Sequence, residues 1–339
     1  MNVAEYLPTV VNEGPLLTAY TLNKLKKLVK EKTVILPVCS LGTELSELAE
    51  YGDLVLPPLY HEAMDDELKS QILARVQQCF PFYEDTRDCA EFEVDFRIVD
   101  LPSKPLPDKK SPRILAFSVD TAVEEHGPHI PLMTDTIQSY GVLQRLEQEI
   151  GGFFAGPPVE YGQLTWGLPF GLSIDITAPL LTRYVTGFTN AVLDWLKPRS
   201  LYVVDVHGSI VHRNAIQDGL RQSRCENWRF RWLHEPLVEF AGDRGDQHAG
   251  GVETSLVHHI SNDLVDASWW PDRIDELADK QMSMSVAIDL SSDLSEFIQQ
   301  VETESMNGIV GDVRNFYEVD ADVMMNRMLG LAREDVGSL

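Results

Sequence analysis

Residues 113–136 read RILAFSVDTAVEEHGPHIPLMTDT, and they decide the fold because an apolar run passes directly into a charged loop. The run at 113–119 has the length and composition of a buried strand. The loop after it crowds acids and histidines around Gly127-Pro128. Such a loop is either solvated or gathers ligands, and the rest of the chain distinguishes the two.

Predicted strands and helices alternate on both sides of this stretch. Apolar or alternating runs predict strands, and apolar residues at helical spacing predict helices. The predicted strands are 33–38 (ended by Pro37), 53–60, 113–119, 200–207 and 227–235, and the predicted helices are 16–31, 65–79, 135–150 and 180–196. This alternation favours an α/β fold with a layered, mainly parallel sheet flanked by helices. In such sheets, functional residues collect at the carboxyl ends of the strands.

Residues 102–112, PSKPLPDKKSP, are the clearest linker, because they hold four prolines and three lysines and show no periodicity. We expect the chain to divide there into an N-terminal accessory region, 1–105, and a core domain, 106–339. The accessory region is expected to pack on the core.

The acidic composition narrows the classes of partner. The 339 residues include 28 basic and 53 acidic side chains and carry a net charge of −25, which argues against nucleic acid or an anionic membrane surface as partner. No apolar run is long enough to span a membrane, and the N-terminus lacks the pattern of a signal peptide. The four cysteines show no CxxC spacing, so we expect them to be reduced. These observations predict a cytoplasmic protein.

Three segments carry side chains of the types that can bind metal ions. The candidate ligands are Glu124, His126 and Asp135 in the loop after 113–119, His207 at the end of the apolar strand 200–207, and Asp246, His248 and Glu253 in GDQHAGGVETS (245–255). A mixed set of carboxylates and imidazoles without thiolates suits Zn²⁺, Mn²⁺ or Fe²⁺. Carboxylates also supply the charge that two neighbouring divalent ions need, with one acid bridging them.

Each of these residues alone has a simpler explanation. A histidine at a strand end is more often a hydrogen-bonded structural residue, and an acid pair in a loop is usually solvated. His129 most simply shapes the Gly127-Pro128 turn, and His258 and His259 are expected on a helix without a role in the site. The convergence of three segments on one chemistry favours a metal site.

Two of these segments resemble motifs of the creatininase (creatinine amidohydrolase) family. EEHGPHIPLMTD (124–135) resembles the family signature E-Q-H-G-P-H-L-P-L-x-T-D, and HAGGVETS (248–255) resembles H-A-G-x-x-E-T-S. VVDVHG (203–208) stands where the family has a strand that ends in N-G-H-G-G-N, and GIVGD (308–312) resembles a glycine-rich segment near the family's C-terminus. The resemblance covers residues 113–330 and implies the α/β fold of the family.

The resemblance also implies a dinuclear metal site. Glu124, Asp135 and His207 would hold one ion. His126 and the bridging Asp135 would hold the other.

One ligand of that family pattern is missing. In members that hydrolyse creatinine, the second ion takes a further Glu two residues after the strand-end histidine. Ser209 occupies that position here, and we infer that Glu253 replaces the missing ligand. His248 matches a histidine that the family uses near the substrate, and it is assigned as the general acid.

The implied chemistry is hydrolysis. Two divalent ions would acidify a water, and the metal-bound hydroxide would attack an amide, cyclic or not, or an activated carbonyl of a small polar substrate. Relatives act on creatinine, formylated pyrimidine intermediates, peptide ends and a cyclic diketone that is cleaved at a C–C bond. The resemblance therefore implies a C–N hydrolase, with C–C hydrolysis as the variant, that assembles as a homo-oligomer, often a hexamer.

Four departures from the family pattern leave a second hypothesis open. Glu125 occupies the position of a glutamine in the family, and Thr121 occupies that of a glycine. Residues 205–210 keep only the His-Gly of the second motif. The loop 161–177 lacks the usual polar residues. Retained ligands in changed surroundings favour an active enzyme with a different substrate. The alternative is a catalytically decayed member that acts as a binding or scaffold subunit.

The N-terminal region carries an echo of the same family. LKKLVKEKTVILPVCS (25–40) resembles the helix and strand that precede the ligand loop in relatives, but Gly42 falls where the metal-binding Glu is expected. Three explanations stay open: a degenerate partial repeat, a helix and strand retained while the strand 113–119 took over the ligand loop, or an accessory region without shared ancestry. The side chains of His61 and Glu62 are further candidates for reaching the metal site from this region.

Overall fold

Two parallel β-sheets organise the residues that the computed structural model describes, which are 14–80, 94–164, 166–242 and 245–339. The first sheet contains β1 (Val34–Cys39), β2 (Leu54–Val55), β3 (Leu59–Tyr60) and β4 (Phe96–Asp100), with β1 at its centre. The second contains β5 (Ile114–Ser118), β6 (Phe153–Ala155), β7 (Ser200–Asp205) and β8 (Trp228–Trp232), in the order β6-β5-β7-β8. The strands of each pair run parallel, which confirms the predicted α/β class.

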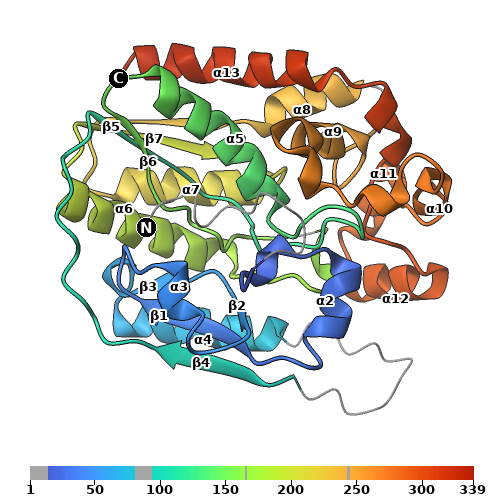
Figure 1. Cartoon of the computed structure of the whole chain (residues 1–339), viewed down its shortest axis with the longest axis horizontal. Helices are drawn as coiled ribbons and strands as arrows, with labels where there is room; N and C mark the ends of the chain where they lie inside the picture. Colours follow the sequence, from blue (N-terminus) through green and yellow to red (C-terminus); the bar gives the residue numbers. More distant parts are fainter. Residues whose placement is uncertain (1–13, 81–93, 165, 243–244) are drawn as a thin grey trace.

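Helices connect the strands and cover the sheets (Figure 1). The longer ones are α4 (Asp66–Cys79), α5 (Thr134–Glu149), α6 (Ala178–Leu196), α7 (Ile210–Gln222), α8 (His234–Ala241), α9 (Gly251–Ile260), α12 (Leu294–Glu304) and α13 (Ala321–Gly337). The shorter ones are η1 (Leu17–Ala19), α2 (Leu22–Leu28), α3 (Leu45–Leu48), η2 (His61–Ala63), η3 (Leu168–Phe170), η5 (Asn262–Leu264), η6 (Ala267–Trp269), α10 (Ile274–Ala278), α11 (Met284–Leu290) and η7 (Val313–Tyr317). The predicted helix 16–31 is instead η1 followed by α2. Among the described residues, no helix combines the length and the apolar character that crossing a membrane requires.

Prolines change the predicted strands of the first sheet. Pro37 does not end its strand, because β1 continues through it to Cys39. β2 pairs with the start of β1 and β3 with its end, so Pro37, which has no N–H to donate, lies opposite the break between them. The predicted strand 53–60 is split into β2 and β3 around Pro57-Pro58.

The two central strands of the second sheet, β5 and β7, are buried on both faces. Alternate residues of β5 and β7 point to opposite sides, with Leu115, Phe117, Leu201 and Val203 in one core and Ile114, Ala116, Tyr202 and Val204 in the other. Residues of α6 and α7 pack in the first core, and residues of α5 and α13 pack in the second (Figure 1). Because helices cover both faces, polar chemistry is confined to the ends of the strands.

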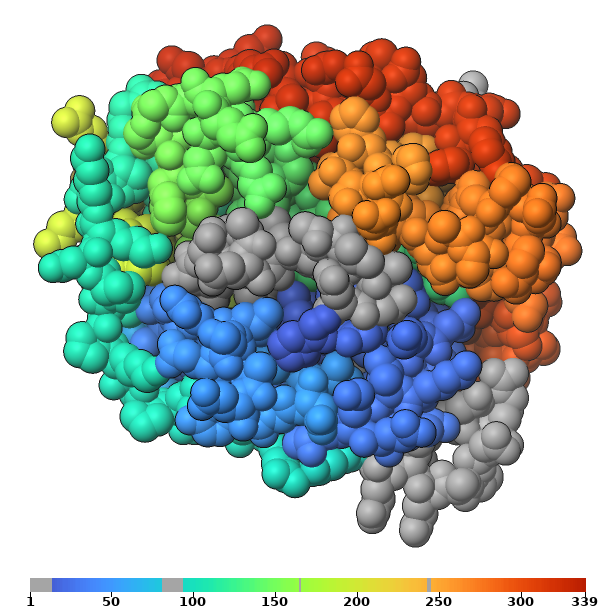
Figure 2. All heavy atoms as spheres, in the orientation of Figure 1, coloured from blue at the N-terminus to red at the C-terminus, as the bar shows by residue number. Residues whose placement is uncertain are grey.

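Helix α6 joins the two sheets. Its Phe188 contacts Tyr60 of β3, with ring centroids 5.9 Å apart, and Phe117 of β5, with centroids 5.1 Å apart. Gly187 permits the close approach, because a Cβ there would lie 1.9 Å from the backbone oxygen of Ala63. In the space-filling view, the N-terminal residues (blue) pack along the lower half of the molecule (Figure 2). The boundary at residue 105 and self-association stay predictions.

The N-terminal segment also positions the charged loop between β5 and α5. The backbone N–H of Leu132 donates to the oxygen of Tyr20 at 3.2 Å, and that of Met133 donates to the oxygen of Thr18 at 3.1 Å. At the other end of the loop, the N–H of Val119 extends the sheet by donating to the oxygen of Val204 at 3.0 Å. The loop is therefore held at both ends before any ligand binds.

Candidate metal centre

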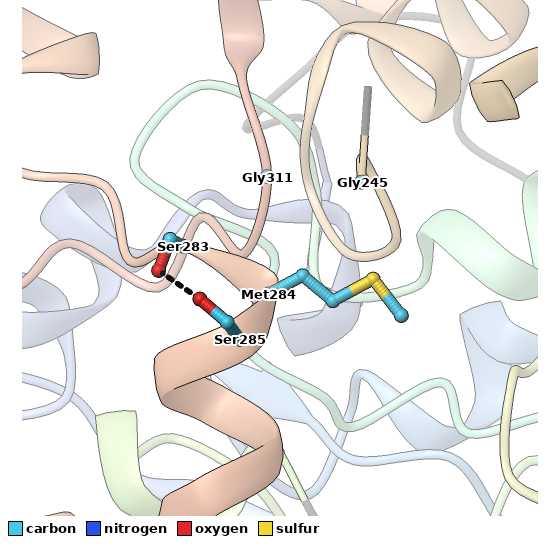
Figure 3. Close-up of a pocket in the computed structure, with 5 residues that line it drawn as sticks. All are labelled: Gly245, Ser283, Met284, Ser285 and Gly311. Atoms are coloured by element: carbon cyan, nitrogen blue, oxygen red, sulfur yellow. Dashed lines mark hydrogen bonds between the residues drawn. The ribbon is translucent and has the colours of Figure 1, made fainter. Parts of the chain in front are cut away.

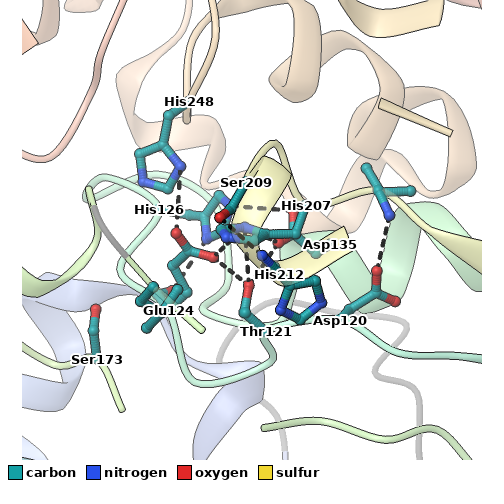
Figure 4. Close-up of polar contacts among 12 residues, drawn as sticks. Asp120, Thr121, Glu124, His126, Asp135, Ser173, His207, Ser209, His212 and His248 are labelled. Carbon is teal, nitrogen blue, oxygen red and sulfur yellow. Dashed lines mark hydrogen bonds and ion pairs between the residues drawn. The ribbon is translucent and has the colours of Figure 1, made fainter. Parts of the chain in front are cut away.

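The predicted ligands meet at the carboxyl ends of β5 and β7. These strands are direct neighbours, so the loop after β5 and His207 after β7 lie side by side. Figure 4 shows Glu124, His126, Asp135 and His207 pointing toward one another, with His248 above them. All of these side chains are at least nine-tenths buried. The structure thus brings three distant segments of the sequence to one point.

One group of donor atoms forms around Nδ1 of His207. This nitrogen lies 3.1 Å from Oε2 of Glu124 and 3.3 Å from Oδ2 of Asp135. Asp135 lies in the first turn of α5, where the partial positive charge of a helix N-terminus favours a carboxylate. The hydroxyl of Thr121 contacts the same three side chains (Figure 4).

A second group forms around Nε2 of His126. It lies 3.5 Å from Oδ1 of Asp135 and 3.9 Å from Oε2 of Glu253. Nδ1 of His126 donates to the backbone oxygen of Glu124 at 3.1 Å, so a neutral ring would offer the lone pair of Nε2 to an ion. Asp135 therefore directs one oxygen to each histidine, as a bridging ligand would.

His248 borders both groups. Its Nδ1 lies 3.9 Å from Oε1 of Glu124, and its ring centroid lies 4.4 Å from that of His126. Its Nε2 donates to the backbone oxygen of Glu125 at 2.7 Å. His126, His248 and Glu253 each offer a ligand atom, and these atoms lie within 4.8 Å of one another.

Hydrogen bonds within residues 246–253 and to the segment 308–312 position His248 and Glu253. The His248 backbone pairs with Val310 in the glycine-rich segment 308–312, and the carboxylate of Glu253 accepts the N–H of Ala249 at 2.6 Å. Gly250 is required at its position, because a Cβ would lie 1.6 Å from Oδ1 of Asp246. The Asp246 carboxylate accepts N–H groups of Val252 and of Asn315. Asp246 therefore supports the loop.

Hydrogen bonds hold the backbone of His207 in place, and a second histidine packs against its ring. The N–H of His207 donates to Asp205 at 2.8 Å, and its backbone oxygen accepts from the Trp232 indole at 2.8 Å. His212 lies against it, with ring centroids 5.1 Å apart. The Nε2 of His212 donates to the oxygen of Val119 at 3.0 Å, and burial, aided by the neighbouring His207, lowers the pKa of His212 to about 3. His212 is therefore a neutral, structural histidine.

The donor set fits divalent metal ions. Nε2 of His126, the ring nitrogen that faces Asp135 and Glu253, is buried and without a hydrogen-bond partner, and a buried polar atom is costly unless a ligand satisfies it. A tetrahedral ion with bonds of about 2.0–2.1 Å needs donor atoms roughly 3.3 Å apart, which is close to the 3.1–3.5 Å separations around His207 and His126. In the described part of the chain, no lysine or arginine pairs with these carboxylates.

The pKa values of the cluster reflect both its burial and its paired charges. Against the effect of burial, His207 lowers the pKa of Glu124, and His126 and His207 hold the pKa of Asp135 well below its usual range. Burial raises the pKa of Glu253 to about 8. Burial alone would lower the pKa of His126, but the carboxylates of Asp135, Glu253 and Glu124 raise it to about 10. Protons thus compensate charge where cations are lacking. A divalent cation would do the same more strongly.

The weaker candidates lie outside the cluster. The His61 ring bonds to the backbone oxygen of Leu101, and Glu62 accepts the N–H of Leu41. His129 bonds to the hydroxyl of Thr254 at 2.8 Å, close to the Gly127 turn as predicted. The histidines 258 and 259 lie on α9.

Sequence reasoning missed two members of the surroundings. Thr121 appeared only as a departure from the family pattern, yet its hydroxyl lies among the ligands. His212 gave no motif signal. The available signal was the helix start at Ser209, which caps α7 and places residue 212 one turn later on its buried side.

A cavity of about 230 Å³ lies outside the cluster (Figure 3). It is lined by Gly245, Ser283, Met284, Ser285 and Gly311. None of these residues has an ionisable side chain, and the cavity therefore offers nothing to the chemistry of the cluster.

Comparison with known proteins agrees with the motifs. A family model described as creatinine amidohydrolase matches residues 114–329. A mycofactocin precursor peptide peptidase of Mycobacterium ulcerans is 33% identical over 152 residues, which cover 42% of this chain and 57% of that protein. Its counterpart in Mycolicibacterium smegmatis is 28% identical over 149 residues, with the same coverage of 42% and 57%. The chain thus spans little more than half the length of these curated relatives.

Solved structures with a similar arrangement are creatininases. A structure named "Creatininase Mn" has a TM-score of 0.47 at 16% identity and covers 66% of this chain and 90% of its own. Another, a creatinine amidohydrolase (creatininase), has a TM-score of 0.47 at 17% identity and covers 65% of this chain and 88% of its own.

Proposed function

Since the chain belongs to the creatininase family, we propose that it is a metal-dependent hydrolase that cleaves an amide C–N bond of a small polar substrate. The observation that carries this proposal is the buried cluster of Glu124, His126, Asp135, His207 and Glu253, whose donor atoms lie at ligand-like separations and, among the residues that the structure describes, without a lysine or arginine paired to them. Solvated or purely structural acids would not be gathered in this way.

We assign two adjacent ion sites to the cluster. Glu124, Asp135 and His207 would hold the first ion, and His126, Asp135 and Glu253 would hold the second. Bound there, two divalent ions (Zn²⁺, Mn²⁺ or Fe²⁺) would acidify a water and polarise the substrate carbonyl. The carboxylates supply the negative charge that retains the ions in a buried pocket.

His248 is the candidate for proton transfer. Its Nε2–H is committed to the backbone oxygen of Glu125, so Nδ1 carries a lone pair. Burial, aided by the nearby His126, lowers the pKa of His248 to about 4, and the ring is neutral near pH 7. We assign it to accept a proton at Nδ1 from the attacking water and then to donate that proton to the leaving nitrogen. It serves as the predicted general acid only after acting as a base.

The amide is best assigned to a peptide, because the named relatives are peptide peptidases. The loop 161–177 restricts the size of such a substrate. A Cβ on Gly167 would lie 2.8 Å from the side chain of Glu124, so this part of the loop packs directly against a proposed ligand. The Trp166 indole ties it to Ser291 at the end of α11. A short, polar chain end fits this arrangement better than an internal segment of a folded protein. Cyclic amides and C–C cleavage of cyclic ketones are the variants to test.

A second candidate function is a non-catalytic binding or scaffold subunit. The observation that favours it is the loss of one family ligand at Ser209, whose side chain instead caps α7. In this case the cluster would retain ions as structure, and hydrolysis would be absent.

The test is hydrolysis by protein purified without chelators and analysed for metal. We expect two equivalents of divalent metal per chain, together with release of new amino groups from a panel of short peptides. His207→Ala is expected to lose a metal ion and turnover, and His258→Ala, an exposed change on α9, is expected to lose neither. Two bound ions without hydrolysis of peptides, cyclic amides, formamides or cyclic ketones would favour the scaffold.

A further inference from the structure

The hydroxyl of Thr121 contacts one donor atom from each proposed ligand of the first ion. Its Oγ1 lies 2.8 Å from Oδ2 of Asp135 and 3.3 Å from Nδ1 of His207, and it also bonds to Oε2 of Glu124. Each of these three atoms is the one that faces the space between the ligands. Thr121 therefore belongs to the same group of donors (Figure 4).

The fold fixes the direction of this hydroxyl. The backbone on either side of Thr121 is held by bonds from the N–H of Asp120 to Val159 and from the N–H of Ala122 to Glu160, both 3.0 Å. The Thr121 methyl packs against Gly162, where a Cβ would lie 2.5 Å from it. With its methyl placed on that side and the residue 1% exposed, a β-branched side chain has little freedom to turn its hydroxyl elsewhere.

Hydrogens hold this group together when no cation is present. A threonine hydroxyl has one hydrogen to donate, and a proton on Nδ1 of His207 supplies a second to the two carboxylate oxygens. An ion among the four atoms would take the place of the proton on Nδ1, because all four atoms can present lone pairs to it.

We propose that Thr121 Oγ1 is a fourth protein ligand of the ion held by Glu124, Asp135 and His207. The inference rests on the proposed function in that it requires an ion at this position. The hydroxyl stays protonated, directing a lone pair to the ion and its hydrogen to a carboxylate oxygen. Serine and threonine hydroxyls bind Mg²⁺ in this way in phosphate-binding loops.

The test compares a substitution that removes the hydroxyl with one that keeps it. Thr121→Val keeps the branched shape and removes the oxygen, and Thr121→Ser keeps the oxygen. Metal-free forms of both, and of the wild type, are titrated with Mn²⁺ by calorimetry, and bound metal is counted by elemental analysis. We expect Thr121→Val to raise the Kd of one of the two bound ions by about tenfold or more. Even the loss of a residue that only hydrogen-bonds to a metal ligand lowers metal affinity by about 10–100-fold. Thr121→Ser is expected to bind close to wild type.

A thiol at the same position gives a readout that does not depend on affinity. In Thr121→Cys loaded with Co²⁺, a side-chain atom that touches the ion produces a thiolate-to-cobalt charge-transfer band. We expect the band in this variant and not in the wild type, whose own cysteines lie elsewhere in the sequence. This arm also covers the case in which Thr121→Val fails to fold.

The outcomes separate the inference from the proposed function. Equal or tighter binding by Thr121→Val, or cobalt binding without the band in Thr121→Cys, overturns the ligand role and means that the hydroxyl competes with the ion. The two-metal hydrolase would survive that result. A wild type that binds no Mn²⁺, Zn²⁺ or Fe²⁺ at all overturns the proposed function and the inference together.

Discussion

The hydroxyl of Ser209 donates a 2.6 Å hydrogen bond to Oε1 of Gln163. The hydroxyl oxygen of Ser209 accepts the N–H of His212 at 3.2 Å and so caps the N-terminus of α7. Ser209 is therefore committed to the helix and to the loop 161–177. Besides Asp135, Nε2 of His126 has the carboxylate of Glu253 near it, with Oε2 at 3.9 Å. If a second ion binds, its retention depends on that residue.

Glu253→Gln is expected to reduce bound metal from two equivalents to one. Glutamine has the same shape and its side-chain oxygen still accepts the N–H of Ala249, a bond of 2.6 Å in the wild type, so the loop is kept and the charge is lost. Elemental analysis of the purified variant measures the effect. Glu235→Gln, an exposed change on α8, is the matched control. A variant that holds two ions tightly would remove Glu253 from the ligand set.

Metal is expected to stabilise the folded chain. Ligands that bind the native state alone add RT ln(1 + [L]/Kd), or about 2.7 kcal/mol per site at a hundredfold excess over Kd. An ion would also offset the repulsion that Asp135 exerts on Glu124 and on Glu253. Calorimetry should show a higher Tm with Mn²⁺ or Zn²⁺ than with chelator. His207→Ala should show a smaller rise, and an unchanged Tm in the wild type would contradict a buried metal site.

The gathering of the ligands was predictable because strand ends leave a signal in the sequence. The apolar runs that became β5 and β7 each stop at charged residues, and parallel neighbours bring the loops at their carboxyl ends together. The family motifs added Glu253 and His248 from a third segment. These two sources together placed the ligands without any knowledge of contacts.

Features that depend on close approach were not predictable. Gly162 gives the Thr121 methyl its space, and Gly187 lets α6 touch the backbone of Ala63, but a glycine in a sequence does not name its neighbour. The separate first sheet depends on β1 pairing with β4, whose residues lie far along the chain. Local periodicity contains no information on such pairing.

Two glycines in helices provide opposite predictions for the same substitution. Gly330 lies inside α13 with open space where a Cβ would stand, so Gly330→Ala should stabilise the protein by about 0.5–1 kcal/mol through helix propensity. Gly187 lies inside α6, and its Cβ would meet the backbone oxygen of Ala63 at 1.9 Å. Gly187→Ala should therefore destabilise despite the same propensity gain. Urea unfolding measures both, and equal effects would contradict the contact between α6 and η2.

Phe188→Ala is expected to cost about 3–5 kcal/mol of unfolding free energy. This ring lies between Tyr60 of the first sheet and Phe117 of the second, and all three rings are buried. Phe188→Leu should cost much less, because most of the volume remains. Urea denaturation of both variants gives the values. A cost below that of Phe188→Leu would argue against α6 as the link between the sheets.

Acid is expected to destabilise the metal-free protein through His129. Burial, aided by the nearby His126, lowers the pKa of His129 to about 3, against an ordinary value of about 6.5 in the unfolded chain. Between these values the unfolded state binds the proton and the native state does not, so stability falls as pH drops below about 6.5, by up to roughly 1.4 kcal/mol per pH unit for one proton. His129→Gln keeps a donor for Thr254 and does not titrate, so its stability should fall less steeply. Urea unfolding in chelator at several pH values measures the slopes, with the exposed change His258→Gln as control. Parallel curves for the wild type and His129→Gln would mean that His129 is not held neutral by the fold.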